Sequence, residues 1–155
     1  MPVTSRSLLL FALPALLLAP SAHALGIHDA RTPEPPPGAP VLAGYMELHN
    51  EGDEAVTITG ASSPAFEHVE IHDTKVEDDQ ATMFELDTLE VPAGGQVSLV
   101  PRGKHVMLYT PAEEVVVGDT LPLTLETDQG TIAVELEVID RDELESHNGD
   151  GDHDH

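Results

Sequence analysis

Short runs of alternating apolar and polar residues dominate the chain after residue 24. In Leu42–Asn50, the residues Leu42, Gly44, Met46 and Leu48 fall on every second position. Alternation with a period of two predicts a strand with one face in a core and the other toward water. No stretch of this region shows the spacing of an amphipathic helix. We therefore expect an all-β protein.

The predicted strands follow one another at intervals of roughly 8–12 residues, and Gly, Pro, Asp and Asn separate them. The clearest turns are Asn50–Asp53, Pro92–Gly95 and Asp128–Gly130. This arrangement is typical of an antiparallel β-sandwich or barrel. The predicted strands are Ile27–Arg31, Leu42–Asn50, Ala55–Ala61, His68–Lys75, Thr82–Leu86, Gln96–Val100, Lys104–Thr110, Leu121–Thr127 and Thr131–Ile139.

The start of the chain has the layout of a secretory signal peptide. Arg6 precedes the apolar run Leu8–Ala19, and Ala22-His23-Ala24 provides small residues around a cleavage site. The apolar run is too short for a transmembrane helix. We expect residues 1–24 to be removed and the mature protein to be periplasmic, with no membrane insertion after cleavage. An uncleaved membrane anchor is the alternative.

The end of the chain is acidic and ends in His153-Asp154-His155. Its composition predicts a disordered tail over residues 140–155, which leaves residues 25–139 as the folded domain. His147, His153 and His155 could bind Cu(II) or Zn(II) loosely. The alternative is a tail that only keeps the protein in solution.

Composition excludes several kinds of function. The chain has no cysteine, so thiolate metal sites, disulfide exchange and blue-copper centres are ruled out. It has 29 Asp and Glu against six Lys and Arg, and its net charge is −23. Such a surface repels nucleic acid and anionic lipid. There is no recognisable Ser-His-Asp spacing or Gly-rich phosphate loop, and we do not expect an enzyme.

One methionine of a predicted strand stands where a core residue is not expected. In Thr82–Leu86, Phe84 and Leu86 are the expected core residues, so Met83 lies on the opposite face. A methionine there exposes a large apolar side chain without an obvious structural reason. Met46 differs, because it shares the core positions of its strand.

Two histidines and a second methionine show the same pattern. Val106 and Leu108 are the expected core residues of their strand, which places His105 and Met107 together on the outer face. His72 lies outside the core by the same reasoning. His105 and Met107 are two residues apart on one strand face, a spacing that lets an imidazole and a thioether converge on one ion.

Two imidazoles and two thioethers form a soft, uncharged ligand set. Thioether sulfur selects Cu(I), whereas hard cations prefer oxygen. Each residue also has an ordinary explanation, since a lone outward histidine is usually a surface residue and a methionine often fills gaps in a core. From alternation alone, both readings stay open.

His72, Met83, His105 and Met107 together form a His-x10-Met-x21-His-x-Met pattern that resembles the periplasmic PCuAC-type copper chaperones. The resemblance extends over about residues 27–139. Other segments that look like the family are Gly44–Met46, Asn50, Leu89–Gly95, His105–Leu108 and Gly118–Leu125. One departure is Arg102-Gly103-Lys104, where the family usually has Gly-rich sequence and an aromatic residue.

The resemblance implies a cupredoxin-like or immunoglobulin-like β-sandwich that binds one Cu(I) through those four residues. It also implies delivery toward the CuA site of cytochrome c oxidase, with oxidase subunit II or a Sco-type protein as partner. Two alternatives are a periplasmic copper storage or scavenging protein and a metal-free β-sandwich interaction domain.

Overall fold

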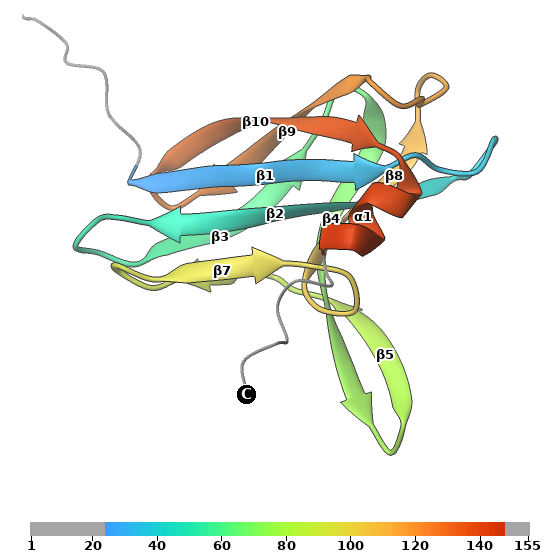
Figure 1. Ribbon diagram of the computed structural model, residues 1–155. Helices are drawn as coiled ribbons and strands as arrows, with labels where there is room; N and C mark the ends of the chain where they lie inside the picture. The colour runs from blue at the N-terminus through green and yellow to red at the C-terminus, as the bar shows by residue number, and fades with distance from the viewer. Residues whose placement is uncertain (1–23, 148–155) are drawn as a thin grey trace, which may run out of the picture.

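The computed structural model describes residues 24–147 (Figure 1). Almost all of the predicted signal peptide, and His153 and His155 of the predicted tail, lie outside these residues. Within them, no helix has the length and apolar character needed to span a membrane. The strands are β1 Leu25–Pro33, β2 Val41–Asn50, β3 Val56–Ser62, β4 Phe66–Glu77, β5 Gln80–Glu85, β6 Leu89–Val91, β7 Gln96–Leu99, β8 His105–Pro111, β9 Thr120–Thr127 and β10 Gly130–Ile139.

The strands form an antiparallel β-sandwich, and the predicted fold class is confirmed. Their order is β5-β4-β8-β2-β1-β10-β9-β3-β6, and β7 also pairs with β2. The pairing of β1 with β10 is parallel. The first half of β2 pairs with β8 and its second half with β7, so this strand joins the two layers of the sandwich. All of the predicted strands are present, whereas the short strand β6 was not predicted.

The core follows the alternation of the sequence. In β2 every second residue is buried, including Met46, as predicted. Fully buried Val, Leu and Ile side chains from both layers meet between them, and each contributes about 1.5–3 kcal/mol through burial. Those with almost no exposed surface are Leu48, Val56, Ile58, Val91, Val106, Leu108, Leu123, Leu125, Leu136 and Val138.

The β4–β5 hairpin extends beyond the sandwich (Figure 1). The pairing of β4 with β8 ends at His72 and His105, whereas β4 continues to pair with β5 as far as Glu77 and Gln80. Every residue of β5 is exposed. The prediction that Phe84 belongs to the core is therefore wrong, and its exposed fraction is 43%. Sequence alternation cannot show that a strand leaves the body of the protein.

A short helix, α1 (Arg141–His147), occupies part of the segment that was predicted to be a disordered tail. Asp140 Oδ1 accepts a hydrogen bond from the Asp142 N–H at 2.9 Å, which caps the helix start. Leu144 is buried and holds α1 against the sandwich. The prediction was wrong here because one apolar residue does not change the average composition of an acidic segment.

A buried amide crosslinks the turn after β2 to β6. Asn50 has an exposed fraction of 2%, and its Nδ2 donates to the carbonyls of Glu54 at 2.7 Å and Val91 at 3.1 Å. Its Oδ1 accepts from the Gly52 N–H at 3.0 Å. The two donated hydrogen bonds need an amide, because an aspartate would set a carboxylate oxygen against the two carbonyl oxygens.

We predict that Asn50→Asp destabilises the protein by about 3 kcal/mol, the cost of leaving buried polar groups without donors. The free energy of unfolding in urea measures the effect. Gln129→Glu is the matched control, because the Gln129 amide bonds the Ala55 carbonyl at an exposed site. Equal effects of the two changes would show that the Asn50 amide does not hold the turn.

Candidate metal centre

Two imidazoles face each other at the point where β4 leaves β8. His72 lies directly opposite His105 in the antiparallel register, and their ring centroids are 5.8 Å apart at an angle of 47°. The side chain of His72 is 14% exposed, and His105 is 6% exposed. Both rings lie on the outer face of the sheet, as predicted, but they are more covered than an open surface site would be.

The two predicted methionine ligands lie on opposite sides of this imidazole pair. Met107 is next along the same face of β8, opposite Glu70 of β4. Met83 lies opposite Thr74 on β5. Because directly opposite residues of an antiparallel pair point to the same side of a sheet, both thioethers share the face that carries the imidazoles. The register thus puts all four predicted ligands on one face.

A groove of about 560 Å³ runs along this face. Met83, His105 and Met107 line it, and His72 lies beside it without lining it. The hairpin forms one wall, and residues of β8 and β2 form the other. Met83 is 59% exposed and is the most accessible of the four predicted ligands, since His72 and Met107 are half-buried and His105 is buried. The remaining lining residues are Val41, Leu42, Ala43, Tyr45, Thr74, Val76, Ala81 and Arg102.

Each imidazole keeps one ring nitrogen free for a ligand. His72 Nε2 is 2.6 Å from Glu70 Oε2. An ionised carboxylate only accepts hydrogen bonds, so in the neutral ring Nε2 carries the proton and Nδ1 carries a lone pair. That Nδ1 atom is buried without a hydrogen-bond partner. His105 Nδ1 donates to the Gly103 carbonyl at 2.8 Å, which leaves its Nε2 unprotonated.

Glu70 organises the donor face, which is the face of the sheet that carries His72, Met83, His105 and Met107, and the sequence analysis missed it. Besides His72, its carboxylate accepts hydrogen bonds from His68 Nε2 at 2.7 Å and from the Tyr109 hydroxyl at 3.1 Å. The hydrogen bond from His72 makes the largest contribution to lowering the pKa of Glu70 below its usual value. Burial, followed by the hydrogen bond to Glu70, raises the pKa of Tyr109. The signal in the sequence was its position two residues before His72, on the same strand face.

This arrangement fits a metal ion. A histidine that binds a metal commonly donates its other ring N–H to a carboxylate or a backbone carbonyl, which fixes the ring and raises its basicity. His72 donates to the Glu70 carboxylate, and His105 donates to the Gly103 backbone carbonyl. A buried nitrogen lone pair without a partner is costly unless something binds it, and the thioethers on the same face are ligands for a soft ion.

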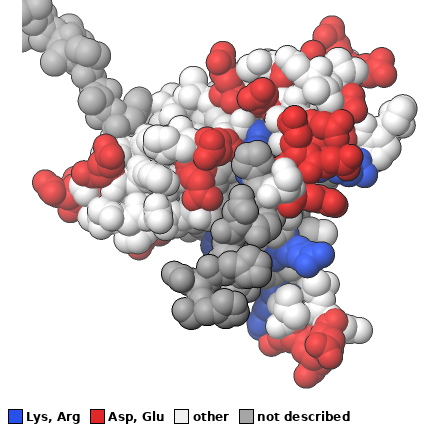
Figure 2. Space-filling model, in the orientation of Figure 1, with Lys and Arg blue, Asp and Glu red and all other residues white. Residues whose placement is uncertain are grey.

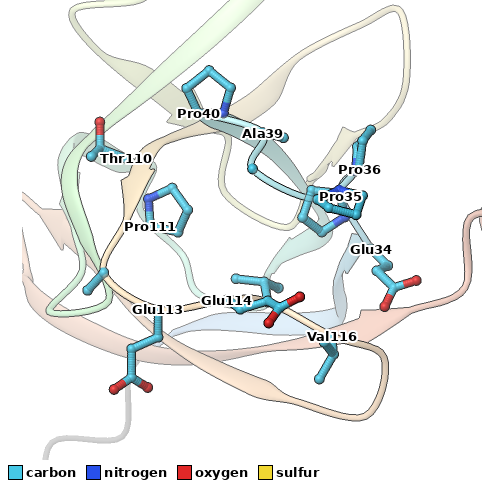
Figure 3. A pocket seen from close by; sticks show the side chains of 14 residues that line it. Glu34, Pro35, Pro36, Ala39, Pro40, Thr110, Pro111, Glu113, Glu114 and Val116 are labelled. Atoms are coloured by element: carbon cyan, nitrogen blue, oxygen red, sulfur yellow. The ribbon is translucent and has the colours of Figure 1, made fainter.

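A second pocket of the protein has a different character. The Pro-rich segment after β1 and the segment after β8 form it, and prolines and glutamates line much of it (Figure 3). None of the four predicted ligands lies there. The predicted metal ligands therefore lie on the donor face and not at this second pocket.

The fold is similar to that of solved copper-bound proteins. The solution structure of CuI-DR1885 from Deinococcus radiodurans has a TM-score of 0.60 at 28% identity, covering 81% of this chain and 83% of that one. The copper-bound PCuAC domain from PmoF2 has a TM-score of 0.64 at 22% identity, covering 76% and 93%. The predicted resemblance to PCuAC-type proteins is confirmed.

The sequence itself matches a family model. The model described as "Putative lipoprotein LpqE-like" matches residues 25–138. This chain belongs to the LpqE-like family. A relative, "Putative lipoprotein Lxx21020" from Leifsonia xyli subsp. xyli, is 27% identical over 120 residues, which are 77% of this chain and 72% of the relative.

One cationic side chain lines the groove of the LpqE-like domain, whose surface as a whole is strongly acidic (Figure 2). Arg102 lines the groove. Lys104 and Lys75 do not line the groove and are paired with carboxylates: Lys104 Nζ is 3.2 Å from Asp73 Oδ2, and Lys75 Nζ is 2.8 Å from Glu77 Oε1. Arg102 and Lys104 belong to the segment that departs from the usual PCuAC pattern, so this departure changes the charge beside the site and leaves the four predicted ligands in place.

We predict that the two imidazoles of the metal-free LpqE-like protein populate opposite tautomers when both are neutral. His72 should carry its proton on Nε2 because Glu70 accepts it, and His105 on Nδ1 because the Gly103 carbonyl accepts it. Long-range ¹H–¹⁵N correlation spectra of the ring nitrogens distinguish the two forms. Protein unfolded in urea is the control, in which both rings should give one pattern. A shared tautomer in the folded protein would contradict the hydrogen-bond assignment.

Proposed function

We propose that this protein is an exported copper carrier that binds one Cu(I) ion through His72, Met83, His105 and Met107. The observation that carries the proposal is the unpartnered, buried Nδ1 of His72 directly across from His105. The side chains of both methionines lie on the same face of the sheet. The copper in the structures of CuI-DR1885 and of the PmoF2 domain supports the choice of metal.

The chemistry of the donors supports Cu(I) over other ions. Both imidazoles are fixed with one bare nitrogen, and thioethers have no proton to lose, so the proposed ligand set has no charge of its own. Glu70 is occupied by three hydrogen bonds and would orient His72 rather than bind the ion. A neutral set with two sulfurs suits a soft monovalent ion better than Zn²⁺ or Mg²⁺.

The unequal exposure of the ligands suggests how the ion leaves. His72 and His105 are held by hydrogen bonds on the body of the sandwich, whereas Met83 lies on the projecting hairpin. A donor from another protein would bind the ion at the exposed side while Met83 dissociates. The imidazoles would hold the ion until the exchange is complete, and copper would stay in the Cu(I) state.

Delivery toward the CuA site of cytochrome c oxidase is the destination that we propose. The resemblance to PCuAC-type chaperones motivates it and suggests oxidase subunit II or a Sco-type protein as recipient. We further propose that the carrier works in the periplasm after export, in keeping with the lipoprotein description of its family. Such a role needs a site that releases copper readily, and the exposure of Met83 supports it.

We predict that replacing Met83 and Met107 together by Leu lowers Cu(I) affinity by more than about 100-fold. Removing a residue that only hydrogen-bonds a metal ligand costs about 10- to 100-fold, and the loss of two ligands should exceed this. Leucine preserves side-chain volume, so the fold should persist. Titration against a chromophoric Cu(I) chelator measures the affinity. Met46→Leu is the matched control, because Met46 lies in the core. Unchanged affinity in the double variant would reject the ligand assignment.

We also predict that Glu70→Ala lowers Cu(I) affinity by about 10- to 100-fold, because His72 loses the carboxylate that orients it. The same competition titration measures this change. Glu85→Ala is the matched control, since Glu85 is exposed and lies opposite His72 on the other neighbouring strand. Equal losses in the two variants would mean that nearby negative charge, rather than orientation of His72, is what Glu70 contributes.

A further inference from the structure

The free edge of β5 lies beside Met83. β5 is the last strand in the order and is paired with β4 on its other side. The Leu86 N–H donates to the Ile71 carbonyl of β4 at 2.8 Å. Because N–H groups alternate in direction along a strand, those of Ala81, Met83 and Glu85 point away from β4. These groups form the free edge.

The hairpin presents apolar side chains at this edge. On β5, Met83 is 59% exposed and Phe84 43%, and Val76 of the neighbouring strand β4 is 65% exposed. Edge strands are usually protected by charged residues, proline or a bulge. Within β5, Glu85 at the end of the strand is the one charged residue, and there is no proline. An uncovered edge with exposed apolar side chains is the kind of surface that binds an added strand.

Charge indicates what kind of strand fits. Glu77, Asp78 and Asp79 form an exposed acidic tip of the hairpin, and Glu85 and Asp87 lie near its base. Antiparallel pairing of two copies would bring the acidic tip of one hairpin beside the acidic base of the other. The net charge of −23 adds long-range repulsion between copies. Both features favour a cationic partner.

We propose that the free edge of β5 docks an extended, cationic segment of the protein that exchanges copper with this chain. The segment would pair with β5 and place a methionine, histidine or cysteine opposite Met83. Opposite side chains in a sheet have Cβ atoms about 4.5–5.5 Å apart and share a face. The new bond from that donor to Cu(I) would form as the bond from the Met83 sulfur breaks, and no electron is transferred. This inference rests on the proposed copper-carrier function.

Ala81→Pro tests the edge without touching a ligand. It removes one N–H from the free edge and leaves the hydrogen bonds to β4, because the Ala81 N–H points outward. Proline is tolerated on edge strands in this orientation. Ala81→Ser is the matched control, since serine is of similar size and keeps the N–H. The chelator titration measures Cu(I) binding by both variants, and their peptide binding is compared at equal Cu(I) loading.

The probe is a synthetic cationic peptide of alternating Lys, Val and Thr with one central methionine. Added to the ¹⁵N-labelled protein, it should slow amide hydrogen exchange at Ala81, Met83 and Glu85. Ala81→Pro should bind the peptide about tenfold more weakly than Ala81→Ser, which corresponds to the loss of one hydrogen bond. Equal binding by the two variants, or slowed exchange at other amides only, would overturn the docking site.

Two further results identify a different occupant and also overturn the proposal. Slow exchange at the same three amides without peptide, lost on dilution, would mean that a second copy pairs with β5. Slow exchange of these amides that is lost when residues 148–155 are removed would mean that the end of the chain itself pairs with β5. If the unsubstituted protein binds no Cu(I), the proposed function fails together with the exchange role. If Cu(I) binds normally but the peptide does not bind at the free edge, only the docking proposal is rejected.

Discussion

The pairing of β4 with β8 is the constraint on which the donor face depends. Val69 and Ile71 of β4 and Val106 and Leu108 of β8 are buried on the core side of these two strands. A slip of the register by one residue would turn these side chains toward water and His72 into the core. Each exposed aliphatic side chain would cost about 1.5–3 kcal/mol. The hydrophobic core on one face therefore fixes the position of the imidazole pair on the other, with no residue serving both purposes.

The end of that pairing divides the donor face into a fixed part and an accessible part. His105 is held through the Gly103 carbonyl, which also accepts a hydrogen bond from the Thr74 hydroxyl at 3.3 Å. Beyond this point no third strand from residues 24–147 lies beside the hairpin, and a two-stranded hairpin is only marginally stable alone. Met83 therefore lies on an element with little local support, which is where ligand-exchange steps are usually found. Fixed imidazoles and an accessible thioether are what a carrier needs.

Alternation in the sequence was sufficient for the strands and for the shared face of the four predicted ligands, because both follow from the two-residue period of a strand. It could not show that Phe84 is exposed, since that depends on where β8 begins and not on β5 itself. The burial of His105 was missed for a related reason, because the groove walls come from other strands. The Glu70 carboxylate needed a register before its three partners could be recognised. The buried Leu144 of α1 was hidden by the acidic residues around it.

The acidity of the chain does not by itself explain the proposed metal preference. A protein with 29 Asp and Glu has many oxygen ligands for hard cations. On the donor face, however, the carboxylate nearest the imidazole pair already accepts hydrogen bonds from His68, His72 and Tyr109. Among residues 24–147, Arg102 of the neighbouring loop is the one cationic residue that lines the groove. The negative charge is thus dispersed over the surface, while the residues that face the groove offer neutral nitrogen and sulfur. Selectivity would follow from the types of donor, because a hard divalent ion gains little from two thioethers and two imidazoles while the Glu70 carboxylate is engaged by its own hydrogen bonds.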